Sequence, residues 1–162
     1  MQALVDTTGL WGLIFEDSKY HDYIIENLEG RNVVVLSIQL LELFIIVYRE
    51  FSEYGKKPQK GLEKLLEILT FLTTRSFEKY NIKLNYQPTT SENLMEALFL
   101  IIERPDLFRR RGPKETTWLE IIDAVLAVFW RKTKMTLYTC DRNLIKFGRE
   151  NNLEYQLIKS IS

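Results

Sequence analysis

The sequence is poor in the residues that build several common kinds of active site. Its 162 residues include one cysteine, Cys140, and one histidine, His21. A single cysteine excludes a disulfide scaffold and any zinc site made of clustered cysteines. A single histidine excludes multi-histidine metal sites, and it leaves Ser-His-Asp or Cys-His catalysis only if His21 itself serves. Catalysis by this chain would therefore depend on carboxylates, which its 22 aspartates and glutamates supply.

Glycine is also scarce, with seven residues in the chain. None of them is clustered behind a predicted strand, so the glycine-rich loops of P-loop and dinucleotide-binding proteins are absent. A haloacid-dehalogenase-like phosphatase would need an Asp-x-Asp motif after the first strand, but the position two residues after Asp6 holds Thr8. The sequence therefore argues against these routes to phosphate chemistry.

Long hydrophobic runs are missing as well. The longest apolar stretch, from Val33 to Tyr48, contains Ser37, Gln39 and Glu42. It is shorter than the ~20 residues that a membrane-spanning helix needs. The N-terminus reaches an aspartate before any apolar run is long enough for a signal peptide. We expect a soluble, cytoplasmic protein that does not contact a membrane.

Positive and negative charges balance over the chain, with 22 of each. They are unevenly distributed, because residues 1–30 are mainly acidic whereas residues 104–114 and 131–149 are mainly basic. Such segregation permits a basic rim on a neutral protein. The alternative interpretation is a set of solvated helix ends.

The hydrophobic pattern alternates between strands and helices. Apolar and β-branched runs predict strands at residues 3–5, 33–36, 82–86, 135–139 and 155–158. Helices are predicted around residues 10–14, with Thr7 or Thr8 as the cap, and at 20–28, 38–54, 61–79, 91–103, 116–131 and 142–150, with a basic loop at 109–113. The predicted fold class is α/β, a three-layer α/β/α sandwich with a five-stranded, mainly parallel sheet. We expect one domain over residues 1–162.

Four acids fall at informative places in this pattern. Asp6 and Asp141 each follow a predicted strand, and ligands of open parallel sheets bind outside the carboxyl ends of the strands. Each of them has an alternative explanation as a helix N-cap. Glu42 and Asp123 interrupt helices that are apolar nearly all round, and Glu120 shares a helical face with Asp123. A buried carboxylate is usually paired or bound to metal, so the alternative here is a buried Arg or Lys partner.

Four carboxylates that converge at one sheet edge would repel one another strongly. The arrangement makes sense if hard divalent cations hold them, because Mg²⁺ and Mn²⁺ prefer oxygen ligands.

These features resemble those of the PIN-domain nucleases, which include the VapC-type ribonuclease toxins. The resemblance spans nearly the whole chain, with threonine at position 8 where the family usually has serine. It rests on Leu4-Val5-Asp6-Thr7-Thr8, on Leu41-Glu42-Leu43, on Glu120-Ile121-Ile122-Asp123-Ala124, and on Leu137-Tyr138-Thr139-Cys140-Asp141 with Asn143 and Phe147.

The resemblance implies a five-stranded parallel sheet, an acidic pocket that binds Mg²⁺ or Mn²⁺, and hydrolysis of phosphodiesters, usually in RNA. It implies that the catalytic, metal-binding residues are Asp6, Glu42, Asp123 and Asp141. Thr8, Thr139 and Glu120 are expected to support them, although packing or capping explains the two threonines equally well. The expected function is a metal-dependent endoribonuclease, and the alternative is a non-catalytic PIN-like module that binds RNA or a protein.

Further expectations concern the partners of the protein and the environments of its tryptophans and histidine. The basic stretch of Arg109, Arg110 and Arg111, with Lys114, is expected to contact the RNA substrate, although such a stretch is less typical of the family. An antitoxin protein is a possible partner, and we expect a homodimer that uses apolar faces of helix 61–79 or helix 93–102. Trp11, Trp118 and Trp130 lie in helical apolar patterns and are predicted to serve the core or an interface rather than as base-stacking platforms, whereas His21 is predicted to be exposed.

Overall fold

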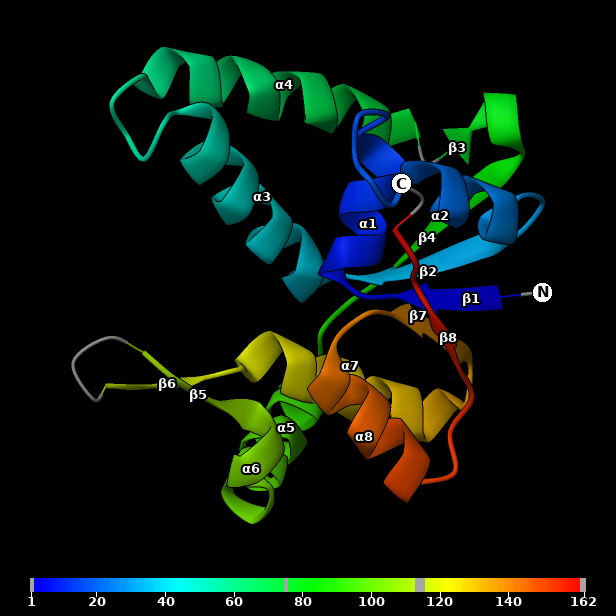
Figure 1. Ribbon diagram of the computed structural model, residues 1–162, viewed down its shortest axis with the longest axis vertical. Coiled ribbons are helices and arrows are strands. Elements are labelled where there is room, and N and C mark those ends of the chain that lie inside the picture. The colour runs from blue at the N-terminus through cyan, green and yellow to red at the C-terminus, as the bar shows by residue number, and fades with distance from the viewer. Residues whose placement is uncertain (1, 75, 113–115, 161–162) are drawn as a thin grey trace.

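The computed structural model describes residues 2–74, 76–112 and 116–160 (Figure 1). Its strands are β1 (Gln2–Val5), β2 (Asn32–Leu36), β3 (Ser76–Phe77), β4 (Ile82–Gln87), β5 (Arg109–Arg111), β6 (Thr117–Leu119), β7 (Thr136–Thr139) and β8 (Tyr155–Leu157). Its helices are α1 (Thr7–Ile14), α2 (His21–Leu28), α3 (Ser37–Phe51), α4 (Pro58–Thr74), the 3₁₀ helix η1 (Glu78–Tyr80), α5 (Ser91–Glu103), α6 (Pro105–Phe108), α7 (Ile121–Thr133) and α8 (Arg142–Glu150).

The main sheet has the strand order β3-β4-β2-β1-β7-β8. The five strands from β4 to β8 in this order are parallel, and the short β3 pairs antiparallel with β4 at the edge. The central strand β1 lies between β2 and β7, with Leu4 opposite Val34 on one side and Leu137 on the other. The predicted three-layer α/β/α fold with a five-stranded, mainly parallel sheet is confirmed, and β3 is an addition to it.

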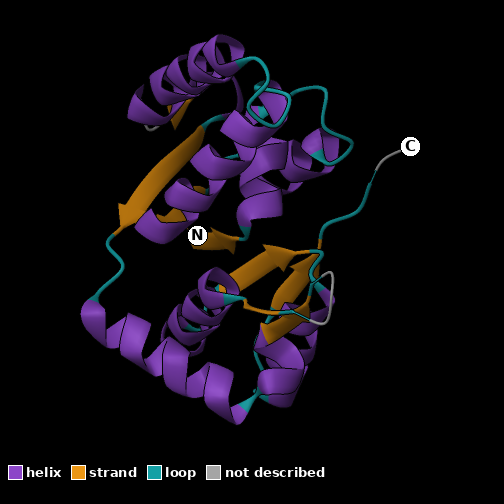
Figure 2. Cartoon of the chain, turned by 90° about the vertical axis from the view of Figure 1, so that its left-hand side faces the viewer, coloured by secondary structure: helices purple, strands orange, loops and turns teal. Residues whose placement is uncertain are grey.

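Two hydrophobic clusters cover the two faces of the sheet, as Figure 2 shows for the helices on either side. Ala3 and Val5 of β1 point into the cluster built with α1, α2, α3 and α4. Leu4 points the opposite way, into the cluster built with α5, α6, α7 and α8. Successive strand residues alternate between faces, so an uninterrupted apolar strand such as β1 is buried on both.

The segment from Pro105 to Glu120 differs most from the sequence-based prediction. Instead of a basic loop followed by a helix from residue 116, the structure has the short helix α6 and an antiparallel hairpin of β5 and β6. Pro105 begins α6, because proline is tolerated in the first turn of a helix. The Leu107 and Phe108 side chains are buried and anchor α6 in the core.

Two other elements differ from their predicted form. Helix α4 ends at Thr74 rather than at residue 79, and Phe77 and the η1 turn follow it. His21 is buried rather than exposed, and its Nδ1 lies 2.8 Å from the carbonyl oxygen of Gly12. None of the helices among the described residues is both long and apolar enough to span a membrane.

Candidate active site: an acidic pocket at the sheet edge

Asp6 and Asp141 lie side by side because β1 and β7 are neighbouring parallel strands. Asp6 continues the pairing, and its backbone N–H donates to the carbonyl oxygen of Tyr138 at 3.1 Å. Each aspartate also caps the next helix. The Asp6 Oδ1 accepts from the Gly9 N–H at 2.7 Å, and the Asp141 Oδ1 accepts from the N–H groups of Asn143 and Leu144. The capping explanation therefore holds for both, and Asp6, not Thr7 or Thr8, caps α1.

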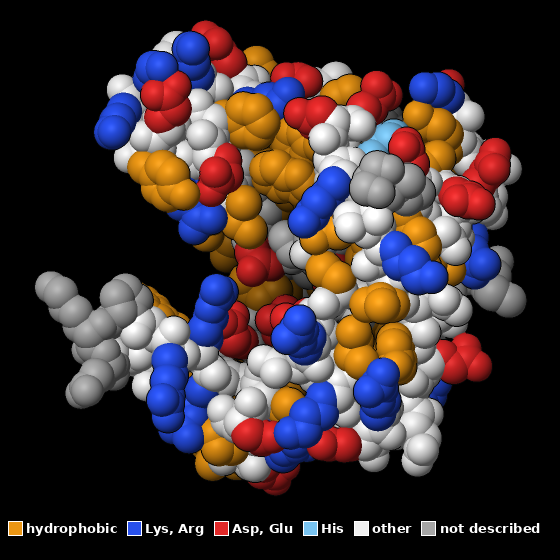
Figure 3. Space-filling model, in the orientation of Figure 1, with side chains coloured by type: hydrophobic (Ala, Val, Ile, Leu, Met, Phe, Trp, Pro, Cys, Tyr) orange, Lys and Arg blue, Asp and Glu red, His pale blue; other side chains and the backbone are white. Residues whose placement is uncertain are grey.

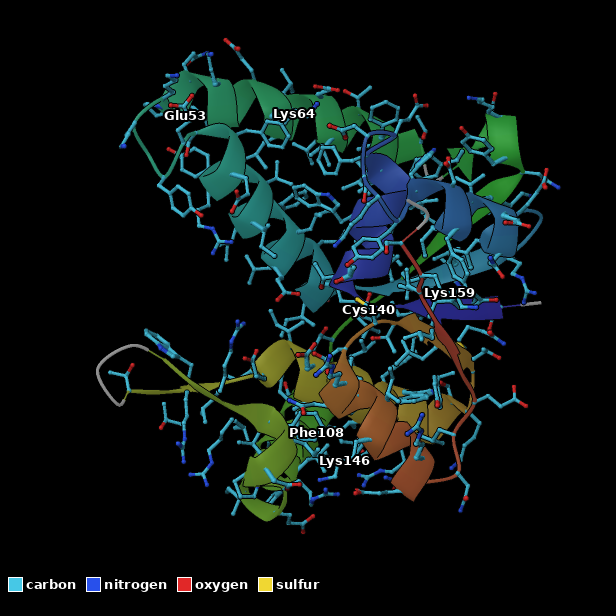
Figure 4. The ribbon with its side chains drawn as sticks, viewed as in Figure 1. Glu53, Lys64, Phe108, Cys140, Lys146 and Lys159 are labelled. Carbon is cyan, nitrogen blue, oxygen red and sulfur yellow. The ribbon has the colours of Figure 1, made fainter. Side chains whose placement is uncertain are left out.

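Thr139 connects the two aspartates. Its side chain is fully buried, and its hydroxyl donates to the Asp6 Oδ2 at 2.5 Å. The Thr139 hydroxyl oxygen also accepts a hydrogen bond from the Asp141 N–H at 3.0 Å. The expected supporting role of Thr139 thus corresponds to direct contacts. Thr8 also lines the pocket, where its side chain hydrogen-bonds with Cys140, which Figure 4 labels near the carboxyl ends of these strands.

Glu42 and Asp123 reach the pocket from two helices on opposite faces of the sheet. Glu42 lies in α3 and accepts a short hydrogen bond from the Thr7 hydroxyl. Asp123 lies in the first turn of α7, which begins at Ile121. Both side chains are half-buried, and in the described part of the chain neither forms a salt bridge with a Lys or Arg. The alternative of a buried cationic partner is therefore not observed.

The four predicted acids line one pocket of about 370 Å³. Glu120 and Arg110 line it too. A second hollow of about 290 Å³ adjoins it and shares Asp123, Asp141 and Glu120. In the space-filling view, acidic side chains lie at the back of a deep recess, with basic side chains at its lower rim (Figure 3). The complete pocket lining is Asp6, Thr7, Thr8, Trp11, Tyr20, Glu42, Ile46, Arg110, Glu120, Asp123 and Asp141.

Burial and repulsion from neighbouring charges raise the pKa values of Asp6 and Asp123. Burial raises the pKa of Asp6 to about 6, with a smaller contribution from the charge of Asp141, although hydrogen bonds from Thr139 and Gly9 oppose the shift. Burial also raises the pKa of Asp123, and the charges of Asp141, Glu42, Glu120 and Asp6 add to it. These shifts are those of like charges held close together in a partly desolvated pocket.

Both positive and negative charges in the pocket affect the pKa of Glu120. Burial raises its pKa above the ordinary value, the Arg110 guanidinium lowers it, and the charges of Glu42 and Asp141 raise it. Glu120 and Arg110 therefore face the same space as the four acids.

The acids of the pocket have the donor atoms of a metal site but not its closed geometry. Among the described residues, no three Asp, Glu, Cys or His side chains surround a common point as metal ligands do. The donor chemistry fits a hard cation, because all four acids offer carboxylate oxygens and none is already neutralised by an ion pair in the described structure. To enclose one cation, their side chains would have to rotate towards one another.

Sequence reasoning missed two residues that shape the pocket. Thr7, which holds Glu42, was considered only as a helix cap. Gln39 is fully buried, its Nε2 donates to the Val5 carbonyl at 2.7 Å, and its Oε1 accepts from the Leu36 N–H at 2.8 Å. It thereby ties the start of α3 to the end of β1, one turn before Glu42. The sequence feature that could have identified Gln39 is its position as a polar side chain inside an apolar run.

The predicted RNA-contacting residues lie on the hairpin at the rim of the pocket. Arg109 and Arg110 line the smaller hollow, and Arg111 lies one residue farther along β5. Lys114 falls outside the described residues.

Similarity to other proteins lies in structure rather than in sequence. No protein-family model matches the chain, and neither does any curated protein sequence. VapC20 of Mycobacterium tuberculosis, a toxin that cleaves the sarcin-ricin loop, matches with a TM-score of 0.59 and 14% identity, covering 90% of this chain and 95% of that one. A chain of the VapBC2 complex of Rickettsia felis, bound to promoter DNA, matches with a TM-score of 0.55 and 19% identity, covering 98% and 100%.

The chain has the PIN-like fold of the VapC structures. PAE2754 of Pyrobaculum aerophilum, at a TM-score of 0.50 and 18% identity, covers 91% of this chain and 84% of its own. At these identities the likeness concerns the fold. The PIN-like fold predicted from the sequence motifs is thereby confirmed, and the four acids line a single pocket at the carboxyl end of its central strands.

Proposed function

We propose that this protein is a VapC-type endoribonuclease that hydrolyses RNA phosphodiester bonds with a divalent metal ion. The observation that carries the proposal is the pocket itself. Four carboxylates from both faces of the sheet share it, and no salt bridge within the described residues neutralises them. Such a concentration of negative charge is costly unless a cation binds there.

Asp6, Asp123, Asp141 and Glu42 are the proposed ligands of Mg²⁺ or Mn²⁺. When bound, the cation would supply Lewis-acid chemistry, making a water molecule more acidic and offsetting the negative charge of the phosphate. The protein holds the acids in place through Thr139, which bonds to Asp6, and through Thr7, which bonds to Glu42. Arg110 at the rim supplies positive charge for the substrate phosphate.

The proposed partners follow from the same fold. RNA is the proposed substrate, because the fold matches a toxin that cleaves the sarcin-ricin loop, and the cytoplasm is the proposed site of action. An antitoxin is a proposed partner, because the fold also matches a chain of a VapBC complex. A homodimer is proposed through the exposed apolar residues of α4 and α5. These include Leu62, Leu66, Met95, Phe99 and Ile102.

The decisive experiment is cleavage of end-labelled RNA, both single-stranded and structured, with Mn²⁺, Mg²⁺ or EDTA. We expect cleavage with either metal, none with EDTA, and a loss of at least about 100-fold for Asp123→Asn. Glu103→Gln, a substitution of an exposed acid on α5, should leave the rate unchanged. Cleavage that EDTA does not affect would refute the metal mechanism. Absence of cleavage by a protein that binds the metal would favour the non-catalytic RNA- or protein-binding module.

A further inference from the structure

The hairpin of β5 and β6, here called the basic arm (Arg109–Arg111 and Thr117–Leu119), has no face in the core. All six residues are exposed. Its base is held by the buried Phe108, whose carbonyl oxygen accepts from the Glu120 N–H at 2.9 Å, and the Gly112 N–H donates to the Thr116 carbonyl at 2.8 Å farther out. A two-stranded hairpin gains little stability from its own contacts in water. An arm that exposes both faces therefore offers its side chains to another molecule.

The strand register divides the arm into two faces. Arg110 lies opposite Trp118, whereas Arg109 lies opposite Leu119 and Arg111 opposite Thr117. Opposed residues of an antiparallel pair project to the same face, and successive residues alternate. Arg110 and Trp118 therefore share one face, and Arg110 also lines the acidic pocket together with Glu120.

The face with Arg110 and Trp118 continues directly from the acidic pocket. Arg110 lines the pocket and lies directly opposite Trp118, which is two residues outward from Glu120 along the chain, a distance of at most roughly 7 Å. Figure 1 shows the arm projecting from the body beside the start of α7. Any strand that reaches the pocket along this face passes Trp118.

The Trp118 side chain is exposed rather than in the core, and it lies on a strand of the arm rather than in the predicted helix. It is 63% accessible to solvent. A Cβ at Gly112 would lie 2.3 Å from its Nε1, so the absence of a side chain at Gly112 lets the indole lie against the backbone of the arm. The ring is thereby supported without being covered. An indole ring that is supported on one side and exposed on the other can stack on a flat chemical group.

We infer that Trp118 stacks on an unpaired base of the RNA strand next to the phosphate that enters the acidic pocket. The inference rests on the proposed nuclease function and adds a base-stacking contact beside its site. Bases stack on aromatic side chains only when they are splayed out of a helix, and cationic side chains hold the backbone beside them. Arg110 is placed to hold that backbone between the stacked base and the pocket.

Charge identifies the occupant as nucleic acid rather than a second copy of this chain. Arg109, Arg110 and Arg111 form no salt bridge with any other described residue. A two-fold dimer through this face would bring the same arginines of both copies together. A phosphate backbone would instead neutralise them.

The test compares two RNA oligonucleotides that differ by one base. Both are single-stranded and carry the cleaved site, and in one the nucleotide beside that site is abasic. Dissociation constants are measured with EDTA present, so that binding is separated from metal-dependent cleavage. The variants are Trp118→Leu, which keeps an apolar side chain without a stacking surface, and Trp118→Phe, which keeps one. Leu119→Ala, at an exposed position on the opposite face of the arm, is the matched control.

We expect Trp118→Leu to weaken binding of the intact RNA by roughly 5- to 100-fold. Trp118→Phe should retain most of the affinity, and Leu119→Ala all of it. The abasic RNA should bind the wild type more weakly and lose nothing further with Trp118→Leu. Tryptophan fluorescence should be quenched by the intact RNA and not by the abasic one.

Three outcomes would overturn the inference. They are wild-type affinity in Trp118→Leu, equal losses on the intact and abasic RNAs, and a Trp118→Leu protein that changes its sedimentation coefficient without RNA, which would make this face a protein interface. Cleavage of the intact RNA by the wild type in Mn²⁺ is scored separately. Its absence would count against the proposed nuclease function, whereas the difference between the two RNAs alone decides the stacking.

Discussion

At the scale of single residues, Thr139 controls the geometry of the acidic pocket. A threonine suits the end of a buried strand because it is β-branched, and its hydroxyl both donates to Asp6 and accepts from the backbone of Asp141. Valine would have the same shape but would leave a buried carboxylate and a backbone N–H without this partner. The pocket therefore depends on a side chain that never has to touch the substrate.

Asp123→Asn should stabilise the metal-free protein while abolishing cleavage. Asp123 faces the charges of Asp141, Glu42 and Glu120, so removing its charge relieves repulsion. We expect a gain of about 1–3 kcal/mol, seen as a rise in melting temperature of roughly 2–4 °C for each kcal/mol. Added Mg²⁺ should stabilise the wild type by mass action and the variant much less.

Thermal unfolding in EDTA checks this expectation, with Glu103→Gln as the variant of an exposed acid. The opposite result is informative. A metal-free Asp123→Asn protein that melts well below the wild type would mean that the carboxylate has a structural partner, because breaking a buried ion pair is strongly destabilising.

The stability of the metal-free protein should rise as the pH falls from about 7 to about 5. The pKa of Asp6 is about 6 in the folded protein, against about 3.9 for an aspartate in an unfolded chain. The folded state binds this proton more tightly, so its stabilisation is fully present below about pH 4 and is lost as the pH rises through about 6. The raised pKa of Asp123 acts in the same direction.

Urea unfolding at a series of pH values in EDTA measures the effect, which should reach a few kcal/mol at most. Asp6→Asn should reduce the dependence, because asparagine can cap α1 but does not titrate. Stability that falls over this interval would contradict the raised pKa values.

At the scale of elements, α3 is held in place by its apolar face, where Leu43 and Val47 are fully buried, and by one hydrogen-bonded side chain. Leu41 and Ile45 of this helix are each 57% exposed, whereas Gln39 is fully buried and bonds to the ends of both β1 and β2. The position of Glu42, one turn later, depends on that connection. A helix anchored in this way presents its carboxylate to the pocket while leaving apolar side chains in solvent.

Gln39→Leu should destabilise the protein by about 2–4 kcal/mol. It leaves the Val5 carbonyl and the Leu36 N–H buried without these partners, and each unsatisfied group costs about 1–3 kcal/mol. Chemical denaturation measures the loss, and Gln59→Leu at an exposed position of α4 is the control. If Gln39→Leu were as stable as the wild type, the connection between α3 and β1 would not matter for folding.

At the scale of the whole molecule, a neutral chain separates its charges in space. The acids gather in the pocket and the arginines of the basic arm lie at its rim, as Figure 3 shows for one face. This separation of charge suits a nucleic-acid substrate. The arginines of the basic arm attract its phosphate backbone, whereas the acids of the pocket repel a phosphate unless a metal cation is bound between them.

Replacing Arg109, Arg110 and Arg111 together by alanine should weaken RNA binding and flatten its dependence on salt. Each lost phosphate contact reduces the slope of log K against log salt concentration by roughly one unit. Binding titrations at several salt concentrations measure the slope, and Lys60→Ala on α4 is the control. An unchanged slope would place the RNA elsewhere, along Arg131, Lys132 and Lys134.

Local patterns in the sequence were sufficient to predict the main sheet and the positions of Asp6 and Asp141 at its edge. Strands such as β1 and β2 are continuous apolar runs buried on both faces, and parallel strands bring the residues behind them to one edge. Asp6 and Asp141 therefore meet as a consequence of strand order. Helices with caps at Thr90 and Asp141 were predicted nearly to the residue, because caps and amphipathic periods are local signals.

Only the tertiary structure decided the features that depend on contacts between distant segments. The basic arm has no apolar alternation to reveal its strands, since both faces are exposed, and its two strands pair over a separation of six to ten residues in the sequence. The bond between Thr7 and Glu42 joins residues 35 positions apart. The burial of His21 likewise reverses its predicted environment, and Trp118 lies outside the core, because burial depends on how elements pack and not on the residue's own neighbours in the chain.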